Sequence, residues 1–435
     1  MKIAIIADDL TGANDTGVQF AKKGWKTSVL MQENQKIEED IEVFVIDTDS
    51  RASSPNEAYK NVRNAINVVE KNSVDILYKK IDSTMRGNIG VELDAIYDHY
   101  PADFILIAPG YPKNNRFVKE GTLIIGDVPL HESEFSNDLK TPIGLSYIPD
   151  IIKKSSVKDV GIISESDLVN NESDIFSKLS NYHDKNIPYL VCDSMEEYHL
   201  EKLVDFIGET EYNVVWCGSA GLANYLSENK ETLNNEEISI NEYLDPILMV
   251  IGSLHDITRE QLNYLLNDST ITGIKLNSHL VVGSEEELNS ETQRVISEIT
   301  TAFENKKNVA LFSSGSKAEI EQSITNGKKY KMDAVQVSDR ISKVLGEITN
   351  KVFKETEINK LFLTGGDTAK KVCTCLDITE FILLNEVETG VPIGVLRGEG
   401  PILTITKAGG FGSLEALHNS YKLFGGGKKC AQLLE

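Results

Sequence analysis

A cluster of carboxylates stands near the start of the chain, directly after the short apolar run 3–7. The segment reads Asp8-Asp9-Leu10-Thr11-Gly12-Ala13-Asn14-Asp15. A carboxylate at the end of a buried strand can accept the proton of a substrate hydroxyl, or bind Mg²⁺ through water. Asp9 or Thr11 can also cap the helix that follows, since Asp and Thr are favoured at that position. Capping explains one such residue but not the whole cluster, so we expect a functional site here.

Positive charge follows two further apolar runs. The first run ends at Ile46 and leads into Asp47-Thr48-Asp49-Ser50-Arg51. Its Arg can grip a carboxylate with two hydrogen bonds, or simply pair with Asp47 or Asp49. The second run ends at Tyr78 and leads into Lys79-Lys80-Ile81-Asp82-Ser83-Thr84-Met85-Arg86-Gly87-Asn88. This local positive density, in a chain of net charge −23, predicts a site for a small hydroxylated anion near a helix N-terminus.

Glycines and small hydroxyl side chains, rather than charges, follow the strands expected in the second half. Glycine lets the backbone approach a ligand closely, and free N–H groups at the start of a helix bind phosphates. Neither a P-loop nor a G-x-G-x-x-G fingerprint is present, and the run 425–428 is interpreted as a flexible tail. Several glycine loops in one half nevertheless predict a nucleotide site: Gly252-Ser253, Ser313-Ser314-Gly315-Ser316, Thr364-Gly365-Gly366-Asp367-Thr368 and Lys407-Ala408-Gly409-Gly410-Phe411-Gly412-Ser413.

The elements that must position these residues are predicted by short apolar runs that alternate with amphipathic segments. Helices are expected over 12–23, 57–69 and 91–97, and apolar runs separated by helices are typical of parallel strands covered on both faces. A polar, acidic stretch over 229–240 is interpreted as a linker, after which the pattern restarts. We therefore predict an α/β protein with two Rossmann-like domains and mainly parallel sheets, over residues 1–235 and 245–435. The expected strands are 3–7, 43–46, 76–78, 104–108, 160–163, 189–192, 214–217, 247–251, 309–312, 361–363, 393–396 and 403–406.

Length, charge and cysteine content exclude several classes of protein. A chain of 435 residues is long enough for two domains with sizeable cores. The excess of 67 Asp and Glu over 44 Lys and Arg argues against nonspecific binding to nucleic acid. No apolar run is long enough for a membrane helix. The five cysteines include Cys373 and Cys375, which we interpret as buried thiols rather than a metal or redox pair, and they indicate a cytoplasmic protein. A homo-oligomer is compatible with the sequence.

Six motifs, in this order, resemble those of the four-carbon acid sugar kinase family, and the resemblance covers essentially the whole chain. It implies ATP-dependent phosphorylation, with Mg²⁺, of the terminal hydroxyl of D-threonate, D-erythronate or 3-oxo-tetronate to a 4-phosphate. It also implies an N-terminal substrate domain, a C-terminal nucleotide domain and an active-site cleft between them. The motifs are Ala7-Asp8-Asp9-Leu10-Thr11-Gly12-Ala13-Asn14-Asp15, Lys79-Lys80-Ile81-Asp82-Ser83-Thr84-Met85-Arg86-Gly87-Asn88, Gly218-Ser219-Ala220-Gly221-Leu222-Ala223, Gly252-Ser253 with Thr258 and Gln261, Gly365-Gly366-Asp367-Thr368, and Lys407-Ala408-Gly409-Gly410-Phe411-Gly412.

Residues and resemblance together define the expected site. Asp9 is the first candidate for the catalytic base and Asp82 the second. Arg51 and Lys80 are expected to bind the substrate carboxylate, while the metal ligands stay unknown beyond Asp367 as a water-mediated partner. The expected substrate contacts are Asp8, Asp9, Arg51, Lys80, Ile81, Asp82, Ser83, Arg86 and Asn88, of which Asp82, Ser83 and Asn88 would sort the hydroxyls. The expected nucleotide contacts are Ser253, Gly365, Gly366, Asp367, Thr368, Gly409 and Gly410.

Two other functions stay open at this point. A two-domain oxidoreductase would need a G-x-G-x-x-G turn after a strand, with an acidic residue about 20 positions further on, and the sequence contains none. A noncatalytic sugar-acid sensor with two lobes would explain a cleft but not the glycine loops of the second half.

Overall fold

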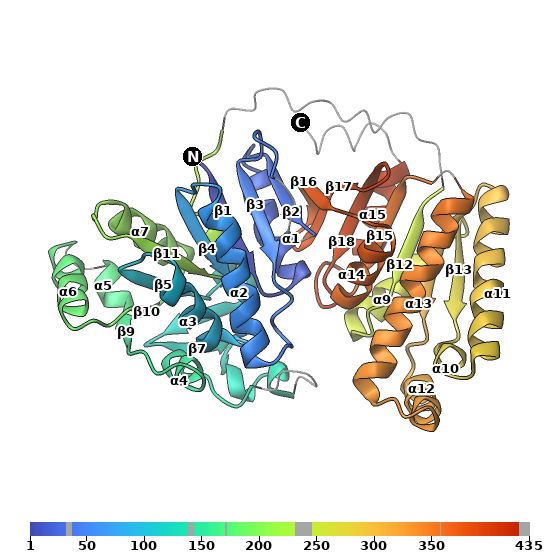
Figure 1. Cartoon of the computed structure of the whole chain (residues 1–435), viewed down its shortest axis with the longest axis horizontal. Helices are drawn as coiled ribbons and strands as arrows, with labels where there is room; N and C mark the ends of the chain where they lie inside the picture. Colours follow the sequence, from blue (N-terminus) through green and yellow to red (C-terminus); the bar gives the residue numbers. More distant parts are fainter. Residues whose placement is uncertain (32–36, 138–142, 170–171, 231–245, 357, 426–435) are drawn as a thin grey trace. The chain divides into compact units, whose positions relative to one another are not determined.

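The computed structural model describes residues 1–31, 37–137, 143–169, 172–230, 246–356 and 358–425. The chain divides into two compact units, residues 1–231 and 232–435, and each unit is an α/β structure (Figure 1). The expected linker 229–240 and the tail at 425–428 lie mostly outside the described residues. Among the described helices, none combines the length and the apolar character needed to cross a membrane.

A sheet of parallel strands forms the centre of the first unit. Its strand order is β2-β3-β1-β4-β11-β5-β10-β9. Every residue of β1 is buried, as expected for a strand in the middle of a sheet covered by helices. The strands are β1 (Ile3–Ala7), β2 (Thr27–Leu30), β3 (Val43–Asp47), β4 (Ile76–Lys80), β5 (Phe104–Ala108), β9 (Val160–Ile163), β10 (Tyr189–Cys192) and β11 (Val214–Gly218).

Helices and one small sheet complete the first unit. The small sheet is antiparallel and holds β6 (Arg116–Lys119), β7 (Thr122–Ile125) and β8 (Val128–Pro129). The helices are α1 (Leu10–Ala21), α2 (Pro55–Glu70), α3 (Ile89–His99), α4 (Ile148–Lys153), α5 (Glu165–Val169), α6 (Glu172–Asp184), α7 (Glu197–Gly208) and α8 (Ala220–Ala223).

The second unit contains a mixed sheet in the order β13-β14-β12-β15-β18-β17-β16. Its first five strands are parallel, and β17 and β16 continue the sheet as antiparallel strands. The strands are β12 (Leu248–Ile251), β13 (Ile271–Leu276), β14 (Asn308–Ser313), β15 (Lys360–Thr364), β16 (Glu380–Glu388), β17 (Val391–Arg397) and β18 (Pro401–Lys407). The helices are α9 (Asp256–Leu265), α10 (Ser278–Val281), α11 (Glu285–Glu304), α12 (Lys317–Lys329), α13 (Ala334–Glu355), α14 (Gly366–Cys375) and α15 (Ala416–Gly425).

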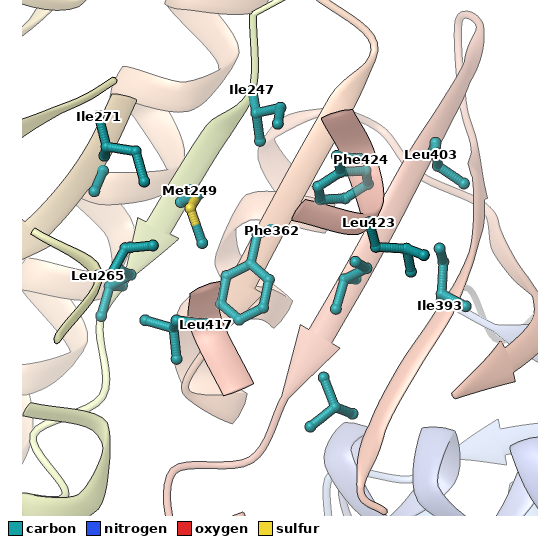
Figure 2. Close-up of a cluster of buried hydrophobic side chains, with 14 of the residues drawn as sticks. Ile247, Met249, Leu265, Ile271, Phe362, Ile393, Leu403, Leu417, Leu423 and Phe424 are labelled. Carbon is teal, nitrogen blue, oxygen red and sulfur yellow. The ribbon is translucent and has the colours of Figure 1, made fainter. Parts of the chain in front are cut away.

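An apolar cluster fixes helix α9 against this second sheet (Figure 2). Met249 of β12 and Phe362 of β15 are fully buried in it, together with Leu265 of α9 and Leu417 of α15. Burying side chains of this size stabilises each of them by about 1.5–3 kcal/mol relative to exposure. The cluster therefore fixes the second half of α9, at Leu262 and Leu265, against the sheet.

The predicted fold class is confirmed, with one difference in strand direction. The runs 393–396 and 403–406 do form strands, but β17 and β18 are antiparallel. Only residues 398–400 connect them, and a connection this short cannot make the crossover that parallel strands need. Helix α1 also begins two residues earlier than expected, because Asp9 accepts a hydrogen bond from the Gly12 N–H and caps it.

A buried ion pair joins strand β4 to helix α3 below the predicted substrate site. Lys79 Nζ lies 2.6 Å from Glu92 Oε2, and both side chains are almost completely inaccessible to solvent. Lys79 Nζ also donates to the carbonyl oxygens of Lys80 and Ile6. The pair therefore holds α3 against β4 and β1, the strands whose ends carry the predicted site.

Replacing Lys79 tests how much the fold depends on this pair. Lys79→Met leaves the Glu92 carboxylate buried without its partner, so the free energy of unfolding should fall by about 3–5 kcal/mol. The double variant K79M/E92M should recover most of this loss. Trp25 and Trp216 are the two tryptophans of the chain and both lie in the first unit, so urea unfolding followed by tryptophan fluorescence reports on that unit. A K79M protein within about 1 kcal/mol of wild type would contradict the expectation.

Candidate active site

Three neighbouring strands bring the predicted substrate residues to one edge of the first sheet. Strand β1 pairs with β3 on one side and β4 on the other, both in parallel. The register places Ala7 opposite Asp47 and Lys80, so all three strands end at the same level. The segments 8–15, 47–51 and 80–88 therefore start from the same edge, where open α/β sheets bind their ligands.

Arg51 bridges two adjacent carboxylates at this edge. Its Nε and Nη2 atoms donate to Asp8 over 2.7 and 2.9 Å, and its Nη1 and Nη2 atoms donate to Asp9 over 2.8 and 2.6 Å. Four of the five N–H groups of the guanidinium are used in this way. Arg51 thus pairs with Asp8 and Asp9, not with Asp47 or Asp49, the simple pairing considered from sequence.

The shared cation separates the acidities of the two aspartates. Burial alone would raise the pKa of Asp8, but the charge and hydrogen bonds of Arg51 overcome it and the pKa is lowered. Burial raises the pKa of Asp9, Arg51 opposes this only in part, and the neighbouring Asp8 carboxylate raises it further. Two close carboxylates whose environments push their pKa values apart are typical of an acid–base site.

Asp82 has different surroundings. Arg86 binds it through Nε at 2.7 Å and Nη2 at 3.0 Å, and the Thr84 hydroxyl donates to it as well. Burial would raise the pKa of Asp82, but Arg86, Arg51 and Thr84 together hold it well below the usual range. A carboxylate stabilised this strongly is a weak proton acceptor, so the surroundings favour Asp9 over Asp82 as a base.

Lys80 and Asn88 connect the loops around the aspartates. Lys80 Nζ donates to the Ile81 carbonyl over 2.8 Å. A Cβ atom on Gly12 would lie 2.7 Å from both Lys80 Nζ and Asp9 Oδ1, so only glycine leaves these two groups their space. Asn88 donates to the carbonyls of Ser50 and Ser53, which ties the loop after β4 to the loop after β3.

Ser83 is half-buried in the loop that follows β4. Its hydroxyl makes no hydrogen bond with any group that the structure describes. Asn88, by contrast, uses its amide N–H groups on backbone carbonyls. Of the hydroxyl-sorting residues expected from sequence, Ser83 therefore keeps its hydrogen-bonding capacity, while Asn88 keeps chiefly its amide oxygen.

The glycine loops of the second unit also meet at one sheet edge. Strands β12, β15 and β18 are adjacent and parallel, so their carboxyl ends lie together. A Cβ atom on Gly252 would lie 1.9 Å from Thr368 Oγ1, and one on Gly409 would lie 2.6 Å from Ser253 Oγ. Gly365 has a positive φ of 98°, and a Cβ there would lie 3.1 Å from the Ser253 nitrogen. The three loops thus approach one another at distances that side chains would block.

Helix α14 begins within this group of loops. Gly365 occupies its capping position, and no side chain in the described part of the chain caps the helix. Asp367 is exposed in the first turn, and Thr368 is buried. An uncapped helix N-terminus that emerges between glycine loops has the backbone donors that bind phosphate groups.

Two residues of helix α9 hold the loop 408–413, although no role was assigned to them from sequence. Thr258 donates to the Gly409 carbonyl over 2.6 Å. Gln261 donates through Nε2 to the carbonyls of Phe411, Gly412 and Ser413. The sequence did place both residues in a motif, six and nine positions after Gly252. It could not reveal their contact with loop 408–413, because that loop lies about 150 residues further along the chain.

The Arg51 bridge predicts how the stability of the first unit depends on pH. The lowered pKa of Asp8 contributes stability above the pKa of an unfolded Asp, about 4, and this contribution is lost as the pH falls through the folded pKa. Arg51→Met should therefore destabilise the unit by about 2–5 kcal/mol near pH 7, and the difference from wild type should narrow below about pH 4.

Tryptophan-monitored urea unfolding over a pH series measures this difference. Lys26→Met is a suitable control, because Lys26 forms only a partly exposed ion pair with Asp40 and should change stability by about 1 kcal/mol or less. A destabilisation by R51M that does not vary with pH would show that the charge of Arg51 is not what matters.

Comparisons with known proteins match domain models to each half of the chain. A sugar-binding N-terminal domain model matches residues 3–226, and a nucleotide-binding C-terminal domain model matches residues 248–417. The D-threonate kinase of Salmonella typhimurium is 33% identical over 95% of this chain and 96% of its own length. The D-erythronate kinase of Heliobacterium modesticaldum is 27% identical over 95% of each chain.

A solved structure supports the fold. The crystal structure of a protein from Salmonella typhimurium LT2 covers 96% of this chain and 98% of its own, with a TM-score of 0.80 and 21% identity. At that identity the likeness shows the fold alone. The two domain models and the identity to the D-threonate kinase go further: this chain is an enzyme of the four-carbon acid sugar kinase family.

Proposed function

We propose that this kinase transfers the γ-phosphate of ATP to the terminal hydroxyl of D-threonate, D-erythronate or 3-oxo-tetronate and forms the 4-phosphate. The observation that carries the proposal is the group at the end of β1, where Asp9 has a raised pKa and lies beside Arg51 and Lys80. A carboxylate next to cations suits a substrate that brings one negative charge and several hydroxyls. The names of the curated relatives favour this function over an oxidoreductase or a noncatalytic sensor.

We assign the sugar acid to the first domain, residues 1–235, and the nucleotide to the second, residues 245–435. The charged groups at the ends of β1, β3 and β4 support the first assignment. The glycine loops at the ends of β12, β15 and β18 support the second. The descriptions of the two matching domain models agree with this division.

In the first domain, the substrate carboxylate would be bound by Lys80 and by the N–H group of Arg51 that Asp8 and Asp9 leave unused. Ser83 and Asn88 would bind hydroxyls together with the backbone at Ile81. Arg86 and Asp82 form a pair that adds both a donor and an acceptor to this surface. Asp8 anchors Arg51 and would contact the substrate at the edge of the same group.

Asp9 would deprotonate or orient the terminal hydroxyl. Its raised pKa makes it the better proton acceptor, whereas Asp82 is held ionised by Arg86 and would act as a hydrogen-bond acceptor for substrate hydroxyls. Phosphoryl transfer needs little covalent chemistry from the protein, so positioning the hydroxyl and neutralising phosphate charge supply most of the catalysis.

In the second domain, the phosphates of ATP would be bound by Ser253, by Gly409 and Gly410, and by the first turn of α14 at Gly365, Gly366, Asp367 and Thr368. Mg²⁺ fits this surface. Asp367 offers an exposed carboxylate beside the helix N-terminus, and the described residues include no cluster of three or more His, Cys, Asp or Glu side chains. Mg²⁺ in phosphoryl-transfer sites usually takes one or two carboxylates and completes its shell with phosphate and water. When bound, the ion would neutralise phosphate charge, and Asp367 would hold it through water.

Asp9→Asn tests the proposed base without disturbing the helix cap. Asn is as good an N-cap as Asp, so the bond from the Gly12 N–H to residue 9 should persist while the ability to accept a proton is lost. Turnover should fall by about 10²- to 10⁴-fold, measured as ADP release with D-threonate and D-erythronate. Asp40→Asn, at an exposed ion pair of the same domain, should leave turnover unchanged. Near-normal turnover in D9N would rule out Asp9 as the base.

Gly409→Val tests the assignment of the nucleotide to the second domain. The added side chain would occupy the space between Gly409 and Ser253 Oγ, so the KM for ATP should rise by about tenfold or more while the KM for the sugar acid stays the same. Gly400→Val is the matched control, because Gly400 lies in the turn between β17 and β18 and its Cβ would meet nothing within 4 Å. Equal changes in the two KM values would argue against the assignment.

A further inference from the structure

A buried lysine lies behind the glycine loop 408–413. Lys407 is the last residue of β18 and is only 3% exposed. Its Nζ atom lies 2.8 Å from the Ala408 carbonyl, 3.1 Å from that of Gly409, 3.0 Å from that of Phe411 and 3.2 Å from Thr258 Oγ1. These four oxygens surround the amine, and three of them belong to the loop, so the contacts with Nζ hold the loop in its conformation.

The environment of Lys407 differs from that of an ordinary buried lysine. Within the described residues, no carboxylate lies at ion-pair distance from Nζ. Glu388 of β16 lies further away, and its charge partly offsets the lowering of the pKa of Lys407 by burial. The Glu388 carboxylate itself accepts hydrogen bonds from the Ser413 N–H and hydroxyl. A buried cation without a carboxylate partner costs stability. An anion bound near the loop would offset this loss of stability.

The direction of the loop carbonyls determines the direction of its N–H groups. In a trans peptide, the C=O of one residue and the N–H of the next point to opposite sides, and the described chain contains no cis peptide. The carbonyls of Ala408, Gly409 and Phe411 point at Lys407, so the N–H groups of Gly409, Gly410 and Gly412 point away from it. None of these three N–H groups donates to a group in the described part of the chain.

We propose that Lys407 is a positioning residue of the nucleotide site, whose ammonium gathers the carbonyls of loop 408–413 and thereby turns a row of N–H donors toward the phosphates of ATP. The proposal rests on the proposed function, since it takes the nucleotide to bind this loop. The charge of Lys407 lies directly behind these donors, and Glu388, the acid that acts on it among the described residues, is too far away to form an ion pair with it, so the ammonium adds attraction for the phosphates.

Lys407→Met tests the role, and Lys360→Met is a matched control. Lys360 is a second buried lysine of the same domain, and it donates to the Phe424 carbonyl. It is the first residue of β15, at the end of the strand away from the glycine loops. Binding of ADP and ATP by calorimetry should weaken by about 10- to 100-fold in K407M. The KM for ATP should rise while the KM for the sugar acid stays unchanged. Lys407→Arg, which keeps the charge, should bind nucleotide more tightly than K407M, and K360M should resemble wild type.

The outcomes separate this proposal from the proposed function. A wild-type protein that binds no ATP would overturn the proposed function and the role of Lys407 with it. Wild-type binding that is unchanged in K407M, or an equal loss in K360M, would overturn the role of Lys407 and leave the proposed function standing.

A measurement on folded protein covers the case in which K407M does not fold. Burial lowers the pKa of Lys407 to about 7, partly offset by Glu388, so the ammonium is lost as the pH rises above that value. ADP affinity of the wild type should therefore fall between about pH 7 and pH 9, and that of K407R should not. His255, the N-cap residue of α9, also faces the loop, 3.2 Å from where a Gly410 Cβ would lie, so the comparison is repeated in a His255→Gln background. An identical pH dependence in K407R would overturn the proposal.

Discussion

Two adjacent carboxylates share one guanidinium at the end of strand β1, and the first domain is organised around that constraint. Asp8 is buried and Asp9 partly buried, and two such neighbouring anions need a cation between them, which Arg51 supplies with four hydrogen bonds. Arg51 can reach both because β3 pairs directly with β1, and the buried Lys79–Glu92 pair holds α3 against the neighbouring strand β4. The result is one carboxyl group with a lowered pKa and one with a raised pKa, on a rigid sheet edge.

The second domain carries a different set of groups at its sheet edge. At this edge, glycines bring the backbone of three loops close together. The proposed donors there are backbone N–H groups. In loop 408–413, Thr258, Gln261 and Lys407 hold the carbonyl oxygens, and these contacts determine the direction of the N–H groups. This division suits the two proposed ligands. A small acid with several hydroxyls is distinguished by side chains of varied chemistry, whereas phosphate groups are bound well by preorganised amides.

Much of this could be predicted from sequence, because the signals were local. Apolar runs predicted the parallel strands, and residues that follow a strand lie at its carboxyl end whatever the rest of the fold. What depended on pairing between distant segments could not be predicted. The partners of Arg51 follow from the register of β1 against β3, and the use of Asn88 on the Ser50 carbonyl follows from the packing of two loops. The antiparallel pairing of β17 with β18 was not predicted, because the apolar content of a strand does not reveal its direction. The role proposed for Lys407 depends on a loop conformation that its sequence does not specify.

The central claim is that the acid held by the first domain receives a phosphate from the nucleotide held by the second. The most direct test is ³¹P NMR of the products after incubation of the wild-type protein with ATP, Mg²⁺ and each of the three four-carbon acids in turn. The account predicts a phosphomonoester signal coupled to the methylene protons at the terminal carbon of at least one acid, with an equal amount of ADP. Release of inorganic phosphate alone, or no consumption of ATP with any of the acids, would contradict it.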